Sequence, residues 1–286
     1  MSRRVVTGAT GTVGAELVRR LLGDGHQPVV VVRDPLAAPA LRAAGAEVVV
    51  ADLEVEGAWQ AQLHGADMVW HLGLPRLSPP LRRRGAERDA ARAAAAAGNL
   101  RRAVGDAPVV LASHVVASVA PELRLAGAVR SAERALAHPE LRVVRLGWGY
   151  GPEGFVAAMV RGLAQGRYRI VGAGENRMPL IAPEDAATAL LAAGGLDPGV
   201  VVAAEDTIPT QLELVHAACA AIGATRPDRL PPRMAALSFG GALVAALTAS
   251  ASADTAALTA AGWAPVRDWR TDLVGISRGG VASAAG

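Results

Sequence analysis

Lysine, cysteine and aromatic residues are scarce in this sequence. All 29 residues counted as lysine or arginine are arginines, so no site in this chain rests on a lysine. The single cysteine, Cys219, cannot form an intramolecular disulfide. The six histidines are scattered singly, and no Cys/His cluster has the spacing of a zinc site. We therefore expect no structural metal.

The charge is nearly balanced although the isoelectric point is basic. The formal net charge is +3 at a sequence pI of about 9.9, and arginines are spread along the whole chain. The run Arg82–Arg84 is followed by Glu87 and Asp89, with no aromatic residues interleaved for stacking on bases. It favours a solvated helix face, and we expect no nucleic-acid partner.

Neither a leader peptide nor a membrane span is expected. The β-branched run Val5–Val6 begins within four residues of the start, which leaves no room for a signal peptide and favours a cytoplasmic location. The segment Ala235–Leu247 is apolar but too short and too rich in alanine and glycine to span a membrane, so it favours a buried helix. We expect a small-molecule substrate and no membrane partner, with a homodimer left open.

Short apolar runs alternate with helical stretches in the first half of the chain. With 286 residues, 51% of them hydrophobic, the chain can bury one large core or a large lobe with a smaller one. All-apolar strands separated by helices indicate a parallel sheet covered on both faces, which is the doubly wound α/β architecture of a Rossmann fold. The runs are Val29–Val32, Val48–Val50, Met68–Trp70, Val109–Leu111 and Val143–Leu146.

The pattern loosens after Gly151. It predicts a dinucleotide-binding domain over residues 1–150, with part of its sheet completed later in the chain, and a mainly substrate-binding lobe over residues 151–286. The expected elements of this second half are helices near Phe155–Gln165 and Pro183–Ala193 and strands at Arg169–Val171 and Val200–Ala203.

Three glycines stand between the first strand and the first helix, in "VVTGATGTVGAELVRRLL" from Val5 to Leu22. Gly8 permits a tight turn, Gly11 lets the backbone approach a pyrophosphate, and Gly14 allows the helix to pack closely on the strand. The phosphates then meet the helix N-terminus, so this segment predicts dinucleotide binding.

The spacing TGxxGxxG resembles that of the short-chain dehydrogenase/reductase superfamily, in particular its extended and atypical, epimerase/dehydratase-like branches. Later segments resemble the family in the same order: "ADL", "VWHLGLP", "VVRLGWGYGP", "MPLIAPEDAATALLAA" and "AGWAP". The resemblance implies cofactor contacts from Thr7, Gly8, Thr10, Gly11, Thr12, Val13, Gly14, Asp52, Leu53, His71, Leu72 and Gly73.

The end of the second strand bears on which dinucleotide is bound. Family members that use NAD carry a carboxylate where this chain has Val32, and Arg33 follows it. A guanidinium can hold a 2′-phosphate through paired, charge-assisted hydrogen bonds, so NADP(H) is favoured over NAD(H). The alternative is a solvated arginine paired with Asp34.

The resemblance breaks at the catalytic residues. The family uses a tyrosine four residues before a lysine, whose charge lowers the tyrosine pKa. Aligning Glu133 with a glutamate common in the family places Leu125 and Val129 at these positions, and a slip of one residue brings in Arg130. No register restores the pair, because the chain has no lysine and its two tyrosines lie elsewhere.

Other residues are candidates for the chemistry. His114 falls nearest the family's serine position, next to Ser113, and Asp89 falls near the asparagine position. A histidine oriented by a carboxylate is a competent general acid near neutral pH, whereas the alternative is a strand-end histidine bonded to backbone. Ser113 is expected to contact cofactor or backbone. The substrate candidates are Tyr150, Pro152 and Arg177. The alternative for Tyr150 is an aromatic that fills the gap between lobes, and the alternative for Arg177 is a turn residue.

Three functions fit these residues. The first is an NADP(H)-dependent oxidoreductase whose apolar or aromatic, quinone- or ketone-like substrate does not need the tyrosine acid. The second is a non-redox isomerase, cyclase or dehydratase that retains the cofactor structurally. The third is a nucleotide-sensing regulatory protein without catalysis. The glycine turn predicts binding in all three cases and does not separate them.

Overall fold

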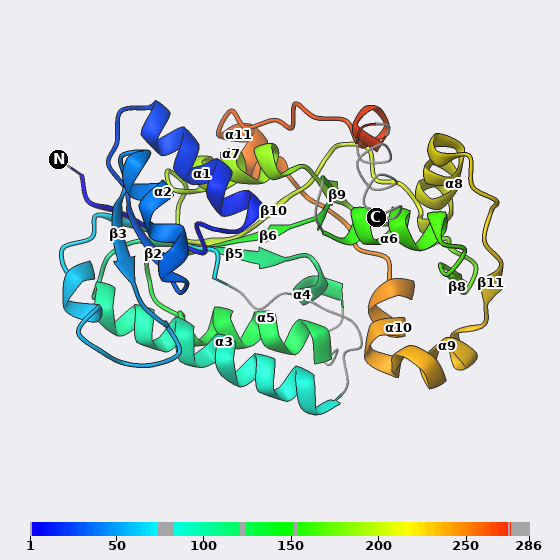
Figure 1. Cartoon of the computed structure of the whole chain (residues 1–286), viewed down its shortest axis with the longest axis horizontal. Coiled ribbons are helices and arrows are strands. Elements are labelled where there is room, and N and C mark those ends of the chain that lie inside the picture. The colour runs from blue at the N-terminus through cyan, green and yellow to red at the C-terminus, as the bar shows by residue number, and fades with distance from the viewer. Residues whose placement is uncertain (1, 74–82, 120–123, 152–153, 274, 276–286) are drawn as a thin grey trace.

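Seven parallel strands form one sheet in the order β10-β6-β5-β4-β1-β2-β3 (Figure 1). The computed structural model describes residues 2–73, 83–119, 124–151, 154–273 and 275. The predicted doubly wound α/β sheet is confirmed. The strands are β1 (Arg4–Thr7), β2 (Val29–Val32), β3 (Glu47–Val50), β4 (Met68–His71), β5 (Val109–His114), β6 (Leu141–Leu146) and β10 (Gly199–Ala203).

Valines supply most of the sheet's two-sided core. All four residues of β2 are buried, as expected of a central parallel strand. Alternate residues point to opposite faces, so Val6 and Val30 belong to one apolar cluster while Val5 and Val29 belong to another. The strands β4 and β5 run past the predicted apolar runs and end at His71 and His114. Their polar last residues therefore reach the carboxyl edge of the sheet.

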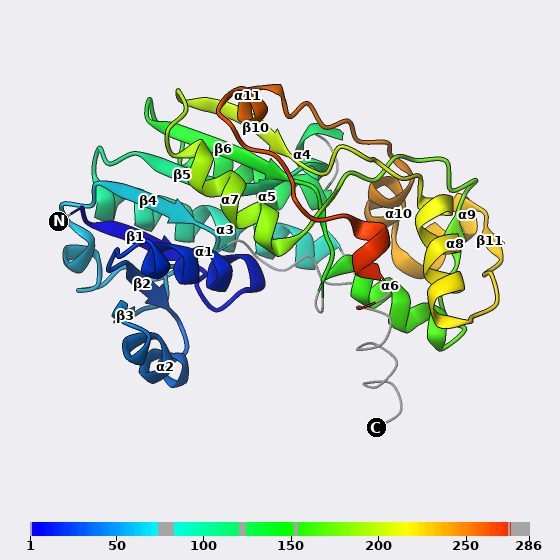
Figure 2. The same cartoon turned by 90° about the horizontal axis from the view of Figure 1, so that it is seen from above.

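Helices cover both faces of the sheet, as Figure 2 shows. On one face, α1 (Thr12–Gly23) packs against α7 (Pro183–Ala193). On the other, α3 (Arg83–Val104) packs along α5 (Arg124–Ala135). Smaller elements complete this half of the fold: η1 (Pro35–Ala37), α2 (Ala38–Ala43), η2 (Gln60–Leu63), α4 (Val116–Val119) and α11 (Ala256–Ala260).

A smaller lobe with its own apolar cluster lies beyond the carboxyl ends of β5 and β6. It contains two small parallel sheets, β7 with β9 and β8 with β11. Because α7 and β10 return to the large sheet, the chain passes from the sheet to this lobe and back, and the boundary at residue 150 stays a prediction. The lobe elements are β7 (Trp148–Gly149), α6 (Phe155–Ala164), β8 (Ile170–Val171), β9 (Leu180–Ile181), α8 (Gln211–Ile222), β11 (Arg229–Leu230), α9 (Pro232–Phe239) and α10 (Gly241–Thr248).

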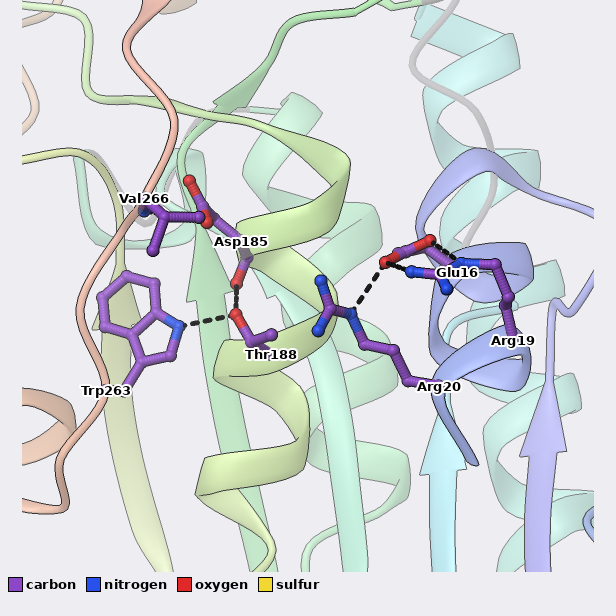
Figure 3. Close-up of polar contacts among 7 residues, drawn as sticks. All are labelled: Glu16, Arg19, Arg20, Asp185, Thr188, Trp263 and Val266. Carbon is purple, nitrogen blue, oxygen red and sulfur yellow. Dashed lines mark hydrogen bonds and ion pairs between the residues drawn. The ribbon is translucent and has the colours of Figure 1, made fainter. Parts of the chain in front are cut away.

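Residues 263–267 cross α7 and are fixed there by hydrogen bonds (Figure 3). The Trp263 indole donates to Thr188 Oγ1 at 3.0 Å. The buried Asp185 carboxylate accepts the backbone N–H groups of Val266 and Arg267, both at 3.0 Å. A buried carboxylate is tolerated because its oxygens are hydrogen-bonded. This contact ties the C-terminal part of the chain to the sheet.

The described residues contain neither a helix that could span a membrane nor a cluster of metal ligands. No helix in the described ranges is long and apolar enough to cross a membrane. In the same part of the chain, no group of three histidine, cysteine or acidic residues lies close enough together to hold a metal ion.

Candidate functional site: a dinucleotide turn beside an altered carboxyl edge

The turn between β1 and α1 accepts only glycine at two of its three positions. Gly8 has a φ of +73°, and a Cβ there would lie 2.7 Å from the carbonyl carbon of Leu72. A Cβ on Gly14 would lie 2.1 Å from the carbonyl oxygen of Gly8. Gly11 meets only Gly8 O, at 3.4 Å. Close backbone packing therefore fixes the shape of this turn.

The N-terminus of α1 is free to bind an anion. Gly11 is its N-cap and supplies no side-chain hydrogen bond, and the first turn, which begins at Thr12, has no acidic residue. The first N–H groups of a helix have no intrahelical partner, and together with the helix dipole they attract a phosphate. The turn and helix fit the pyrophosphate of a dinucleotide.

Thr7 and His71 form a buried pair beneath this turn. They face each other on neighbouring strands, and Thr7 Oγ1 lies 2.6 Å from His71 Nδ1. Burial lowers the pKa of His71 to about 4, so its imidazole is neutral at pH 7. Its Nε2 atom is buried and has no hydrogen-bond partner in the described part of the chain. Leu72 N donates to Thr7 O at 3.2 Å, which holds "HLG" against the glycine turn.

The predicted adenosine-side residues are on the surface. Arg33 is exposed, and no acidic side chain among the described residues pairs with it. Asp34 does not take that role, because its carboxylate accepts the Leu36 N–H at 2.9 Å and caps η1. Asp52 is exposed and accepts the Glu54 N–H at 3.0 Å. The Leu53 carbonyl accepts a hydrogen bond from Asn99 at 2.8 Å. Arg33 thus remains available to a ligand.

At the carboxyl end of β5, Ser113 is part of a network with two charged residues. Its hydroxyl donates to Glu133 Oε1 of α5 at 2.6 Å. Arg145 of β6 donates to both oxygens of Glu133, at 3.1 and 2.9 Å, and its third nitrogen donates to Ser118 at 3.0 Å. The residue used to align the family's catalytic helix is therefore a hydrogen-bond acceptor for Ser113. The hydroxyl of Ser113 thus contacts a side chain, and its expected contact with the cofactor stays a prediction.

His114 points away from that network, toward the lobe. The Val116 N–H donates to its Nδ1 at 3.1 Å, and its ring meets the Trp148 ring edge-on with centroids 4.7 Å apart. Trp148 in turn contacts Phe155 at 4.9 Å between centroids. Burial lowers the pKa of His114 to about 4. The ring is therefore neutral at pH 7, and its proton lies on Nε2.

The expected partner of His114 lies elsewhere. Asp89 is half-buried on α3 beside Arg92, whose own ion pair is with Glu54 at 2.7 Å. Within the described ranges no contact joins Asp89 to His114. Val129, at the family's lysine position, is buried. The side chain of Leu125 lies outside the described residues. The structure therefore brings His114 together with an aromatic wall instead of a carboxylate.

Tyr150 is interior, which favours the gap-filling interpretation over contact with substrate. It is fully buried, and its hydroxyl donates to the buried Glu205, which also accepts the Trp269 N–H at 3.2 Å. Burial, and then the hydrogen bond to Glu205, raise the pKa of Tyr150. Burial raises the pKa of Glu205 to about 7, against the lowering effect of its two hydrogen bonds.

The remaining substrate candidates are Arg177 and Pro152, and the structure describes only the first. Arg177 is exposed, its Nη1 donates to the Ile208 carbonyl at 3.3 Å, and its backbone pairs with Thr210. The backbone N–H of Arg177 also donates to Ser250 Oγ at 3.1 Å. Arg177 thus connects its own segment to two others, which agrees with its interpretation as a turn residue. Pro152 lies outside the described residues.

Two residues of this edge were missed by the sequence analysis. Glu205 lies two residues after β10, and a carboxylate just after a strand of a parallel sheet is a signal for the ligand-bearing edge. Arg145 lies inside β6 among buried valines, where a charged side chain needs a partner. That partner, Glu133, is 12 residues away on α5.

The comparisons with known proteins agree with this geometry. Residues 8–107 match a family model described as NAD(P)H-binding. A ceramide reductase from Caulobacter vibrioides is 34% identical over 191 residues, which are 65% of this chain and 59% of that protein. The match therefore spans less than two thirds of that relative's length.

Solved structures cover nearly the whole chain. The human epimerase family protein SDR39U1, solved with NADPH, has a TM-score of 0.77 at 22% identity and covers 96% of this chain and 99% of its own. UDP-glucose 4-epimerase from Thermotoga maritima, solved with UDP-glucose, has a TM-score of 0.76 at 19% identity, with 98% and 99% covered. These likenesses show the fold. Residues 8–107 are thus an NAD(P)H-binding domain, in a chain with the fold of the epimerase- and dehydratase-like short-chain dehydrogenase/reductases.

Proposed function

We propose that this protein is an NADPH-dependent oxidoreductase that reduces a small apolar or aromatic, quinone- or ketone-like metabolite without a tyrosine–lysine pair. The observation that carries the proposal is the aromatic wall of His114, Trp148 and Phe155, which follows the carboxyl ends of β5 and β6. Ligands of open α/β sheets bind at this edge. An apolar wall there favours an apolar substrate.

The choice of NADPH rests on the end of β2. Val32 occupies the position at which a carboxylate would hold the ribose hydroxyls of NAD and repel a 2′-phosphate. Arg33 is exposed and has no acidic partner among the described residues, so its guanidinium is free to bind that phosphate. The human relative was solved with NADPH, whereas other similar structures hold NAD.

The chemistry follows from the state of His114. When bound, NADPH supplies a hydride. The neutral imidazole of His114 can donate a hydrogen bond from Nε2 to a substrate oxygen, but at a pKa of about 4 it is not a store of protons at pH 7. Reduction of a quinone yields a weakly basic phenolate-type oxyanion, which takes its proton from water. Such a substrate does not require the missing tyrosine.

The experiment is a substrate panel. Purified protein with NADPH is incubated with quinones, aromatic ketones and long-chain ketones, and the absorbance of the reduced nicotinamide is followed. We expect oxidation with at least one apolar acceptor, and the Gly14→Ala variant serves as the cofactor-binding control. A ceramide-type ketone belongs in the panel because one relative is a ceramide reductase. Tight NADPH binding with no oxidation by any acceptor would contradict the proposal.

A nucleotide-sensing protein without catalysis is the second candidate. It is favoured by the commitment of Ser113 to Glu133 and by the buried Val129 at the lysine position. A non-redox isomerase, cyclase or dehydratase is the third, and a tunicamycin-pathway NDP-hexosamine 5,6-dehydratase shares the fold with a TM-score of 0.72 at 19% identity. Cofactor that copurifies with the protein and is neither consumed nor exchanged during turnover of a substrate would favour this third function.

A further inference from the structure

The helix α9 presents two large apolar side chains, Met234 and Leu237, to solvent. Its inner side is held by the buried Ala235, which packs with Val171 and Val244. Leu237 is 90% exposed and Met234 is 57% exposed. Helical spacing places Arg233, Met234, Leu237 and Ser238 on the outer side together, all of them exposed. Two of its large apolar side chains, Met234 and Leu237, therefore face outward.

Arginines are concentrated in the segments that precede this helix and in the segment that pairs with them. Residues 161–172 and 225–241 contain six arginines, Arg161, Arg167, Arg169, Arg226, Arg229 and Arg233, and one acidic residue, Asp228. Their excess positive charge is larger than the net charge of +3 of the entire chain. These residues are distant in the sequence, and the pairing of β8 with β11 brings them together. The fold thus gathers arginines that the sequence analysis described as spread along the chain.

The arginines lie at one end of the molecule. Figure 1 shows β8, β11, α8 and α9 at the end of the lobe opposite β3. Arg169 and Arg226 line the same hollow of about 160 Å³, next to Asp228 and Tyr168. Burial lowers the pKa of His216 on α8, and the positive charges of Arg226 and Arg229 lower it further. We refer to these arginines with Met234 and Leu237 as the basic end face.

We propose that the basic end face docks on the surface of an anionic lipid bilayer. Exposed leucine and methionine side chains on a helix that follows an arginine-rich segment fit a layer of acyl chains beneath phosphate headgroups. Guanidinium groups bind phosphate oxygens through paired hydrogen bonds. A nucleic acid is a poorer fit, because none of the described side chains on the outer side of α9 is aromatic and could stack on bases.

This contact is peripheral. The helix α9 has eight residues, far fewer than the roughly 20 that span a bilayer. The expectation of no membrane partner rested on the lack of a spanning segment, and it did not consider a surface contact. The proposal is independent of the reaction, because it concerns the end of the lobe and not the cofactor turn.

The test is flotation of the full chain with vesicles. Phosphatidylcholine vesicles are compared with vesicles that also contain phosphatidylglycerol, at low and high salt. We expect binding to the anionic vesicles, weakened by salt. Leu237→Glu should reduce binding at least about tenfold, because a charge replaces the exposed leucine that would enter the acyl layer. Arg226→Gln and Arg229→Gln should each reduce it about fivefold.

Matched variants control for exposure and charge. Val266→Glu replaces an apolar residue that is 82% exposed on the segment crossing α7, and Arg42→Gln removes an exposed arginine of α2. Both should bind vesicles as the wild type does. All variants should retain the wild-type NADPH affinity, which shows that they are folded.

Several outcomes overturn the proposal. One is a wild-type chain that does not float with anionic vesicles. Another is binding that Leu237→Glu leaves unchanged. A third is a wild-type dimer that ignores vesicles and becomes a monomer with Leu237→Glu, which would assign the basic end face to a second copy of the chain. Arginine-dependent binding of an oligonucleotide without vesicle binding would assign it to nucleic acid.

Discussion

The glycine turn after β1 and the carboxyl end of β5 lie in the same sheet but follow different rules. At the turn, backbone sterics decide the structure, since a side chain on Gly14 would lie 2.1 Å from another residue's backbone oxygen. At the end of β5, Ser113 takes its role from Glu133 of α5 and indirectly from Arg145 of β6. The first region is encoded locally, whereas the second depends on which side chains the fold brings together.

The largest expected effect is at the turn. Gly14→Ala places a methyl group against Gly8 O, so α1 must move away from β1, and overpacking of this kind costs about 1–3 kcal/mol or more. The pyrophosphate site moves with the helix, and we expect NADPH affinity to fall by at least about a hundredfold. Titration calorimetry and the melting temperature measure the two effects.

Gly23→Ala is the matched control in the same helix. A Cβ at Gly23 meets nothing within 4 Å, so its affinity should equal that of the wild type. If Gly14→Ala bound NADPH as tightly as Gly23→Ala, the turn would not hold the cofactor. The backbone packing at the turn would then not explain cofactor binding.

Local encoding also explains how far the sequence predicted the fold. The run "VVVV" became a buried strand with the predicted bounds, and Pro183–Ala193 became the predicted helix. Both carry their own signals, a β-branched apolar run and a proline at the start of a helix. The ends of β4 and β5 were placed too early, because His71 and His114 do not continue an apolar run. Their place in the strands depends on pairing with neighbours.

The second prediction concerns stability and the buried Glu205. Its pKa rises from 4.5 to about 7 on folding, because burial disfavours the carboxylate. The folded state thus holds this proton more tightly than the unfolded state. Protonated Glu205 therefore contributes about 3 kcal/mol to the free energy of unfolding below pH 4.5. This contribution is lost as the pH rises through 7. Chemical denaturation of the wild type between pH 4.5 and 8 should show this loss.

Glu205→Gln removes the ionisable group and keeps an acceptor for the Trp269 N–H. We expect the difference in unfolding free energy between variant and wild type to change with pH in the direction that favours the variant at pH 8. A parallel pair of stability curves would show that Glu205 is not a titrating interior group. The partner of Glu205, Tyr150, is 55 residues away, so sequence reasoning had no access to the pair.

The third prediction tests the cofactor preference. Arg33→Ala should weaken NADPH binding by about 1.5–3 kcal/mol, the range for a hydrogen bond between charged groups, and leave NADH binding nearly unchanged. Titration calorimetry with both cofactors measures this. Arg42→Gln, on the neighbouring α2, controls for a general loss of positive charge. Equal losses for NADPH and NADH would remove Arg33 from the 2′-phosphate.

The catalytic region could be predicted only in part, because it depends on which side chains the fold brings together. The absence of lysine is a fact of composition, and it excluded the family's acid–base pair without any structure. The pairing of His114 with Asp89 was drawn from their positions in a resemblance. Asp89 is on α3, on the face of the sheet that carries Ser113 and Glu133, whereas His114 contacts Trp148 of the lobe. A one-residue step along a strand changes the face on which a side chain lies.

The smallest expected effect is at His114. A general acid with a pKa near neutrality would lose about 10²–10⁴ in rate when removed. The burial that lowers the pKa of His114 to about 4, and the Val116 N–H on Nδ1, leave it neutral and able only to donate a hydrogen bond from Nε2. We therefore expect His114→Phe to change turnover of the best acceptor by less than about tenfold, with NADPH affinity unchanged. The wild-type pH–rate profile should have no limb between pH 6 and 7 that depends on this residue.

Single-turnover rates of both proteins at several pH values measure the effect of His114→Phe. The melting temperature serves as a check on folding, because the ring packs on Trp148. A hundredfold loss at intact NADPH affinity would make His114 the proton donor after all, and the carboxyl end of β5 would then carry out its chemistry with a residue that its position in the sequence was enough to identify.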